Sequence, residues 1–271
     1  MRKIVRFTRP DRRDEPTDDA DRQRLVALFE RRLCNCLSEI SGDRRPTAFH
    51  TEVQDDQSKG WKQLLDLIET AAAKRWEEFA PAAFMSLERW SQIITLPSTI
   101  GKLKAVRRFD MYGSSVVRIP PEIGEMENLE EFIPYTSHRL HWFPYEITRC
   151  ARLADSTIST RSLYGNYKFR PPFPELQPPL PSTCGLDLED LPPGRYGATS
   201  ITTCSVCRTS ITDAGLYQVW ISLNIGTDIV PLLVNACSAR CVSQLPRTPA
   251  DYVSGPHLGG LSIVQPPASH R

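Results

Sequence analysis

The feature that most constrains this chain is a stretch, residues 96–158, that repeats itself. Ile100, Ile123 and Ile147 occupy the same position in three copies of an apolar-Pro-x-x-Ile pattern, at an almost constant offset. The apolar residues on either side of each isoleucine recur at the same offsets. One unit of this length cannot bury its apolar row alone, so neighbouring units must stack around a shared core.

The first two copies continue as Ile-Gly-x-apolar, ending at Leu103 and Met126. The pattern resembles leucine-rich repeats of about 23 residues that read Leu-Pro-x-x-Ile-Gly-x-Leu. This resemblance implies an α/β solenoid of about three coils. Ser114 and Ser137 stand where such repeats usually carry Asn. Because a short array exposes its core at both ends, the sequence on each side is expected to form caps.

Composition narrows the functional classes. The 271 residues are 40% hydrophobic and carry a net charge of +1, which argues against a dominant role on nucleic acid or a membrane surface. No apolar run of about 20 residues is present, and the basic start lacks the apolar core of a signal peptide. We therefore expect a soluble, cytoplasmic protein, whose 8 cysteines serve as thiols or metal ligands rather than disulfides.

The region before the repeat predicts helices. Apolar residues at helical spacing predict one helix from Asp18 or Asp19 to Ile40, and another from Gln57 or Ser58 to Ala73. Residues 79–90 predict a third, shorter one. Cys34 and Cys36 would diverge by about 200° on a helix, so ordinary helix positions are favoured over metal ligands. We expect this region to cap the repeat, with a separate helical binding module as the alternative.

Four cysteines form the second constellation. Two close pairs, Cys204 with Cys207 and Cys237 with Cys241, flank a predicted hairpin of strands 216–223 and 229–234. A Cys-x-x-Cys turn lets two thiolates converge on one ion, and cysteines four apart share a face of a helix. Together they could complete the tetrahedral four-thiolate site that structural zinc prefers.

This arrangement resembles treble-clef or zinc-ribbon modules, which implies a structural Zn²⁺. Four buried free cysteines and a redox Cys-x-x-Cys are the alternatives, and the redox one lacks a surrounding βαβ pattern. Cys184 and His257 are spare ligand candidates, whereas Cys150 occupies a core position of the repeat.

These patterns divide the chain into five parts. The expected parts are a polar arm and helical cap (1–90), leucine-rich repeats (91–168), a proline-rich connector (169–200), a zinc-binding module (201–246) and a flexible tail (247–271). The connector is expected to be a stiff spacer or a strap along the last coil, with a role as a ligand for a partner as the alternative.

Strand residues between the core positions would face one surface and form ladders across neighbouring coils. The tyrosine pair in this set favours a binding hot spot, although a solvated face without a partner is the alternative. The candidate partner-binding residues are Arg108, Asp110, Tyr112, Glu131, Ile133, Tyr135, Asp155 and Thr157.

The sequence shows no phosphate loop and no His-Glu-x-x-His motif, and no nucleophile or carboxylate is placed by sequence beside His138 and His141. We therefore expect a non-catalytic adaptor that binds a protein or peptide on the repeat. One alternative is a nucleic-acid-associated regulator that uses the zinc module, and an enzyme without a sequence signature is the other. The phosphate contacts of such a regulator would be Arg195, Arg208, Arg240 and Arg247.

Overall fold

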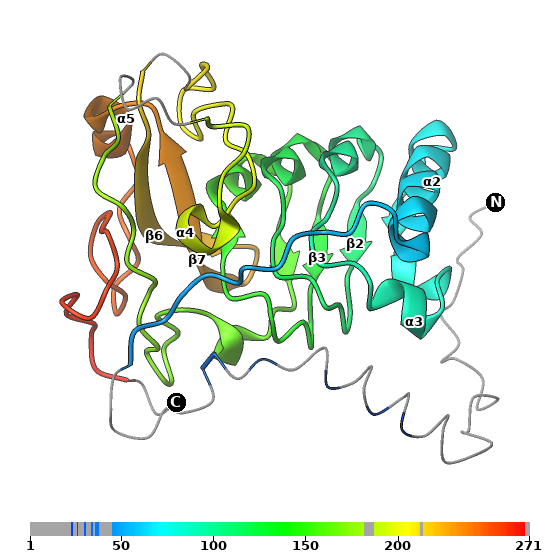
Figure 1. The fold of residues 1–271 in the computed structure, drawn as a ribbon, viewed down its shortest axis with the longest axis horizontal. Coiled ribbons are helices and arrows are strands. Elements are labelled where there is room, and N and C mark those ends of the chain that lie inside the picture. The colour runs from blue at the N-terminus through cyan, green and yellow to red at the C-terminus, as the bar shows by residue number, and fades with distance from the viewer. Residues whose placement is uncertain are drawn as a thin grey trace.

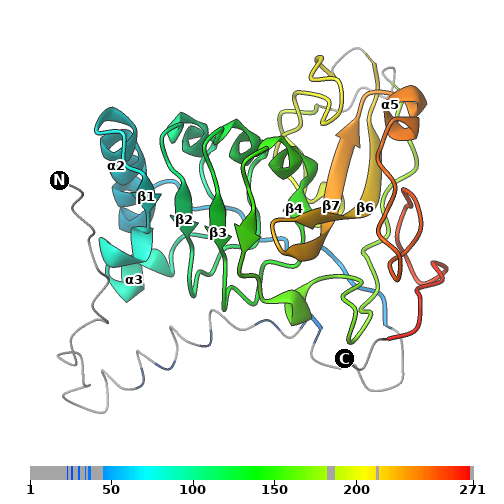
Figure 2. The same ribbon diagram turned by 180° about the vertical axis from the view of Figure 1, so that it is seen from behind.

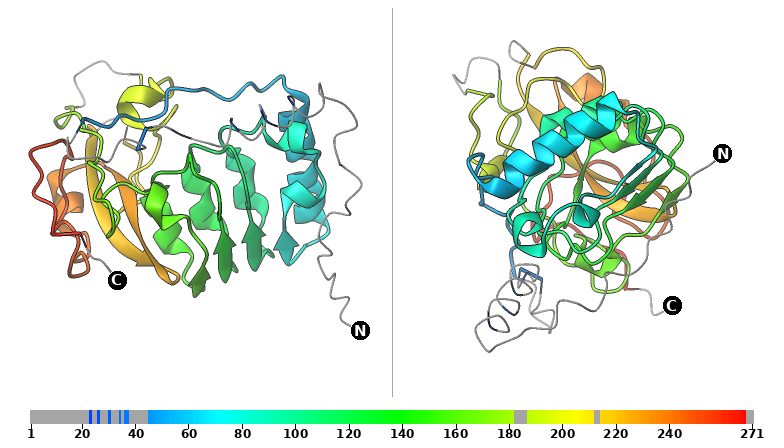
Figure 3. Two further views of the ribbon diagram at one scale, coloured as in Figure 1. Left: turned by 90° about the horizontal axis from the view of Figure 1, so that it is seen from below. Right: turned by 90° about the vertical axis from the view of Figure 1, so that its right-hand side faces the viewer.

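A row of short parallel strands runs along the molecule, with helix α2 (Lys59–Ala73) at one end and a long antiparallel hairpin at the other (Figure 1). Residues 45–56 cross from the hairpin end to α2, over the segments that connect one parallel strand to the next (Figure 3). We call residues 45–56 the strap. This computed structural model describes Gln23, Val26, Glu30, Cys34, Cys36, Leu37 and residues 45–181, 187–211 and 214–268.

The parallel sheet reproduces the period of the sequence. Its strands β1 (Glu78–Phe79), β2 (Arg108–Asp110), β3 (Glu131–Ile133) and β5 (Asp155–Ser156) lie in that order (Figure 2). Arg108 pairs with Glu131, and Glu131 pairs with Asp155. These partners are separated in the sequence by the same offsets as the repeated isoleucines, so each repeat unit contributes one strand and one return.

Each return is a short 3₁₀-helix that follows the repeated proline: η3 (Ser98–Lys102), η4 (Pro121–Glu125) and η5 (Tyr145–Arg149). Their isoleucines are at most 1% exposed and share the interior with the aromatic rings of the strands. The rings of Phe79, Phe109 and Phe132 pack in a row at centroid distances of 5.7 Å, one ring per strand. The repeated positions therefore form one continuous core.

Helix α2 closes one end of this core. It begins after Ser58, whose side chain accepts the N–H of Trp61, and it buries Leu64 and Ile68. The expected third helix over 79–90 is wrong in its first part, because Phe79 extends the aromatic stack as part of strand β1. Only Leu87–Trp90 forms a helix there (α3), after a 3₁₀ turn at Pro81–Ala83 (η2).

The hairpin closes the other end. Strands β6 (Tyr217–Ile225) and β7 (Asp228–Ala236) are joined at Gly226 and Thr227, and β7 pairs in parallel with β4 (Phe143–Pro144). Because Phe143 and Pro144 are the apolar-Pro pair of the last repeat unit, the hairpin continues the backbone pairing of the repeat. The Ser156 hydroxyl of β5 also donates to the Ile225 carbonyl at 2.9 Å.

The segments around the hairpin are packed against it. Phe173 and Leu176 of the proline-rich connector are buried, and the Phe173 ring packs against Trp220 of β6. Residues 247–268 pack against the hairpin instead of forming the expected flexible tail, because His257 exchanges backbone hydrogen bonds with Trp220. The Gln265 amide also donates to the Arg170 carbonyl. Two short helices complete the hairpin end, α4 (Pro193–Tyr196) and α5 (Ala239–Ser243).

Candidate metal centres

The two predicted cysteine pairs meet at one end of the hairpin. The Sγ atoms of Cys204, Cys207, Cys237 and Cys241 all lie within 4.8 Å of one another. Cys237 follows β7 directly, and its Sγ is 3.6 Å from that of Cys207 and 3.6 Å from that of Cys241. The group could hold a metal ion.

Local hydrogen bonds set the positions of these thiols. The Sγ of Cys204 accepts the backbone N–H groups of Cys207 at 3.5 Å and of Cys237 at 3.3 Å. Ser238 caps α5 by accepting the N–H of Cys241, which places that thiol in the first turn. Ser205 ties the Cys-x-x-Cys turn to β7, because its hydroxyl accepts the Asn235 N–H and its own N–H bonds the Asn235 carbonyl.

The four thiols have different electrostatic surroundings. Hydrogen bonds from the Thr209 side chain and backbone lower the pKa of Cys207 to about 6. Burial raises the pKa of Cys204 and raises that of Cys241 to about 12. Because only the thiolate is a metal ligand, a bound cation would have to displace protons from the buried thiols.

The candidate partner-binding residues comprise charged residues that pair with one another, one buried residue and several exposed residues. Arg108 is paired with Glu78, Asp110 and Glu131, so its charge is already balanced within the face. Ile133 is only 8% exposed, and this contradicts its expected role on the surface, because an apolar side chain is excluded from water.

Tyr112 and Tyr135 remain available at the ends of β2 and β3. They are 54% and 46% exposed, and their ring centroids are 6.0 Å apart. Asp155 and Thr157 are also exposed, at the edge where the hairpin turn packs.

The spare ligand candidates do not join the four-cysteine group. His257 packs edge-on against Phe173 at 4.6 Å, and its Nδ1 accepts the N–H of Gly259. Cys184 lies outside the described residues. Cys150 is buried in the repeat core, as its position in the sequence pattern indicates, and its thiol donates to the Ile123 carbonyl.

Sequence reasoning missed a second group of metal-binding residue types. In the N-terminal arm, the part of the chain before the strap, Gln23, Val26 and Glu30 are helical. Cys34 lies outside any helix and Cys36 lies in a turn, so the assignment of these two cysteines to helix positions is wrong. They meet two histidines, His50 and His141, and the ligand atoms of all four lie within 4.8 Å of one another. The Cys-x-Cys pair was visible in the sequence, but nothing local connects it to histidines 14 to 107 residues away.

Within the described parts of the chain, no helix is both long and apolar enough to cross a membrane. Comparison with known proteins finds no matching protein family and no matching curated protein.

Proposed function

We propose that this protein is a non-catalytic interaction protein of leucine-rich-repeat type, with a structural zinc ion in its four-cysteine group. On this proposal it binds an extended segment of a protein partner across the exposed face of its parallel sheet. The agreement between strand register and repeat offset supports the repeat assignment.

The observation that carries the proposal is the pair of exposed tyrosines. Hydrogen bonds hold their backbones in place: the Tyr112 N–H donates to Asp110 Oδ1 at 2.8 Å, and Gly113 N–H donates to the Tyr135 carbonyl at 2.9 Å. Two rigid aromatic rings side by side supply a large contact area at a small cost in side-chain entropy. Tyrosine is also enriched among the residues that dominate binding energy at interfaces.

The charges of the face favour a protein segment over a nucleic acid. Arg108 is surrounded by three carboxylates, so the sheet offers no cluster of free positive charge to phosphates. Tyrosine hydroxyls and rings can instead hydrogen-bond a peptide backbone and cover apolar side chains.

The ligand set supports zinc in the four-cysteine group. Four thiolates in a tetrahedral arrangement are the usual ligands of structural zinc, and they leave no open position for water. The ion would join the end of β7, the start of α5 and the Cys-x-x-Cys turn. The Cys204→Ser, Cys237→Ser variant is expected to lose about one zinc ion per chain.

A random-peptide display library tests the binding face. Peptides selected on the wild-type protein are expected to bind the Tyr112→Ala, Tyr135→Ala variant at least about tenfold more weakly, with little dependence on salt. Phe84→Ala is the matched control, because Phe84 is 52% exposed and stacks on Trp76 at the α2 end. Peptides that bind the tyrosine variant as tightly as wild type would refute the proposed face.

A further inference from the structure

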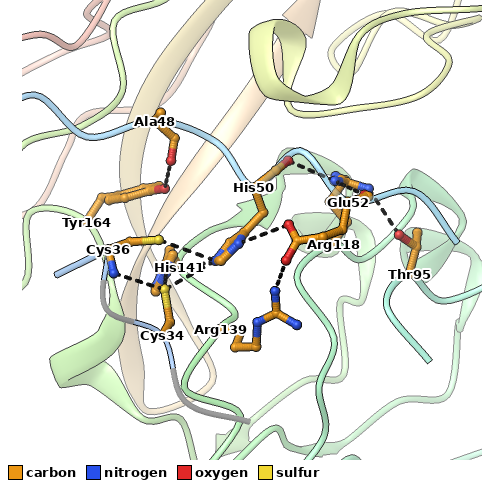
Figure 4. Close-up of polar contacts among 10 residues, drawn as sticks. All are labelled: Cys34, Cys36, Ala48, His50, Glu52, Thr95, Arg118, Arg139, His141 and Tyr164. Atoms are coloured by element: carbon orange, nitrogen blue, oxygen red, sulfur yellow. Dashed lines mark hydrogen bonds and ion pairs between the residues drawn. The ribbon is translucent and has the colours of Figure 1, made fainter. Parts of the chain in front are cut away.

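The second cysteine and histidine group has the dimensions of a bound metal ion. His50 Nε2 is 3.3 Å from His141 Nε2 and 3.5 Å from Cys34 Sγ (Figure 4). Cys34 Sγ is 3.3 Å from His141 Nε2, and Cys36 Sγ is 3.9 Å from His50 Nε2. For a tetrahedral zinc ion, bonds of about 2.0–2.3 Å separate two nitrogens by about 3.3 Å and a nitrogen from a sulfur by about 3.5 Å.

The outer nitrogens of both imidazoles are already bonded in the way metal-binding histidines require. His50 Nδ1 is 3.3 Å from a carboxylate oxygen of Glu52, and His141 Nδ1 is 2.5 Å from the Ser162 carbonyl. Because a carbonyl and a carboxylate only accept, each Nδ1 carries the hydrogen. Arg139 in turn pairs with Glu52 and fixes its orientation. Such partners set the tautomer and ring orientation of metal ligands.

This assignment brings two nitrogen lone pairs close together. With hydrogen on each Nδ1, both Nε2 atoms are acceptors, and they lie 3.3 Å apart in stacked rings. The His141 residue is 1% exposed and the His50 side chain 11%, so little solvent reaches the space between them. Two acceptors that are largely shielded from water repel at this distance unless a cation or a proton lies between them. Two thiols beside them supply the remaining ligands for a cation.

The strap holds His50 in place independently of the cysteines. Buried Arg118 donates to the carbonyls of His50 at 2.9 Å and Glu52 at 2.6 Å. The Tyr164 hydroxyl donates to the carbonyl of Ala48 at 3.0 Å (Figure 4). Two of the four ligands are therefore presented by the folded body of the protein, and only Cys34 and Cys36 come from the arm.

We propose that Cys34, Cys36, His50 and His141 form a second structural zinc site, which clips the N-terminal arm to the strap and to the last repeat unit. Binding of Zn²⁺ releases the two thiol protons and places one ion between two thiolates and two neutral imidazoles. The ion joins residues up to 107 positions apart. Linking them restricts the unfolded chain and holds the arm beside the repeat.

Metal analysis by mass spectrometry of the native protein, purified without added metal, tests this site. The wild-type chain is expected to carry about two zinc ions, and both Cys34→Ser, Cys36→Ser and His141→Ala are expected to carry about one. His138→Ala is the matched control, because His138 lies in the same loop outside the group, and it should retain both ions. Near-ultraviolet circular dichroism checks that each variant is folded.

The outcomes separate this proposal from the zinc of the four-cysteine group. A single ion that is lost in Cys204→Ser, Cys237→Ser but kept in Cys34→Ser, Cys36→Ser would overturn the second site. The opposite pattern would establish the second site and overturn the first. A disulfide between Cys34 and Cys36, seen as a mass lower by two hydrogens, with no second ion, would also overturn it.

Titration of the apo wild-type protein with Co²⁺ tests the site without any substitution. Sulfur-to-cobalt absorption grows with the number of bound thiolates, so two sites hold six thiolates and the four-cysteine site alone holds four. Saturation at two equivalents is expected, with about a third of the absorption contributed by the second site. Saturation at one equivalent, with the absorption intensity of four thiolates, would overturn the proposal.

Discussion

Two glycines at the same repeat position are expected to respond very differently to the same substitution. Gly101 and Gly124 both follow the repeated isoleucine in a 3₁₀ return, and neither has a positive φ, so the backbone accepts alanine at both. A Cβ at Gly124 would lie 2.3 Å from the backbone carbonyl oxygen of Glu146 in the next unit. A Cβ at Gly101 would instead meet the carboxylate of Glu125 at 2.9 Å.

The difference lies in what can move. The Glu146 carbonyl belongs to η5, so relieving the overlap at Gly124 requires two stacked units to separate by roughly 1 Å. Overpacking of this kind costs about 1–3 kcal/mol of unfolding free energy. The Glu125 side chain can rotate away from Gly101, and its exposed ion pair with Lys104 is worth little. Restricting the unfolded chain returns about 0.4–1 kcal/mol, so Gly101→Ala should be close to neutral.

Thermal unfolding followed by circular dichroism measures this difference. At about 2–4 °C per kcal/mol for a chain of this size, Gly124→Ala should lower Tm by about 2–12 °C and Gly101→Ala by no more than about 2 °C. Zinc content is measured on both variants, so that metal loss is not mistaken for overpacking. Equal effects of the two substitutions, or a larger effect at Gly101, would refute the reasoning.

Two further predictions concern pH and metal removal. Burial lowers the pKa of His257 to about 4, so below pH 6.5 the unfolded chain binds more protons and stability falls as pH decreases towards 4. His257→Asn should reduce that fall by at most about 2 kcal/mol, measured as the difference between urea unfolding at pH 7 and pH 5, and an unchanged difference would contradict the assignment. Chelation should lower Tm while keeping a single unfolding transition across the repeat and the hairpin, because both belong to one core; a separate early transition of the hairpin would contradict this.

Regular spacing made part of this structure predictable. The offsets between the repeated isoleucines equal the register of the parallel strands, because each unit returns the chain to the same face. The meeting of the four cysteines could be predicted for a similar local reason. Cys237 directly follows β7, and the Cys-x-x-Cys turn precedes β6 by a short loop, so antiparallel pairing of the two strands brings the two cysteine pairs to the same end of the hairpin.

Strand β1 and the second cysteine and histidine group could not be predicted, because they depend on contacts that leave no periodic pattern in the sequence. Glu78 of β1 pairs with Arg108 of β2 across a longer interval than the repeat offset, because η2 and α3 occupy the intervening chain. The repeat offset therefore does not reveal this strand. The second cysteine and histidine group depends on the strap, whose course is set by Arg118 and Tyr164 bonding backbone carbonyls. Neither contact has a sequence motif, and so the two histidines could not be assigned to one site.

The last repeat unit explains why both candidate metal groups lie at the same end. A short array exposes its core at each end, and α2 covers the first end with an apolar helix face. At the other end, His141 belongs to the second group, Phe143 pairs with β7, and Arg149 donates to the carbonyl of Ser205 in the Cys-x-x-Cys turn. One short segment therefore contacts both the arm and the hairpin. If both groups bind zinc, the two ions would hold the arm and the hairpin against this end of the repeat, where a further repeat unit would otherwise cover the core.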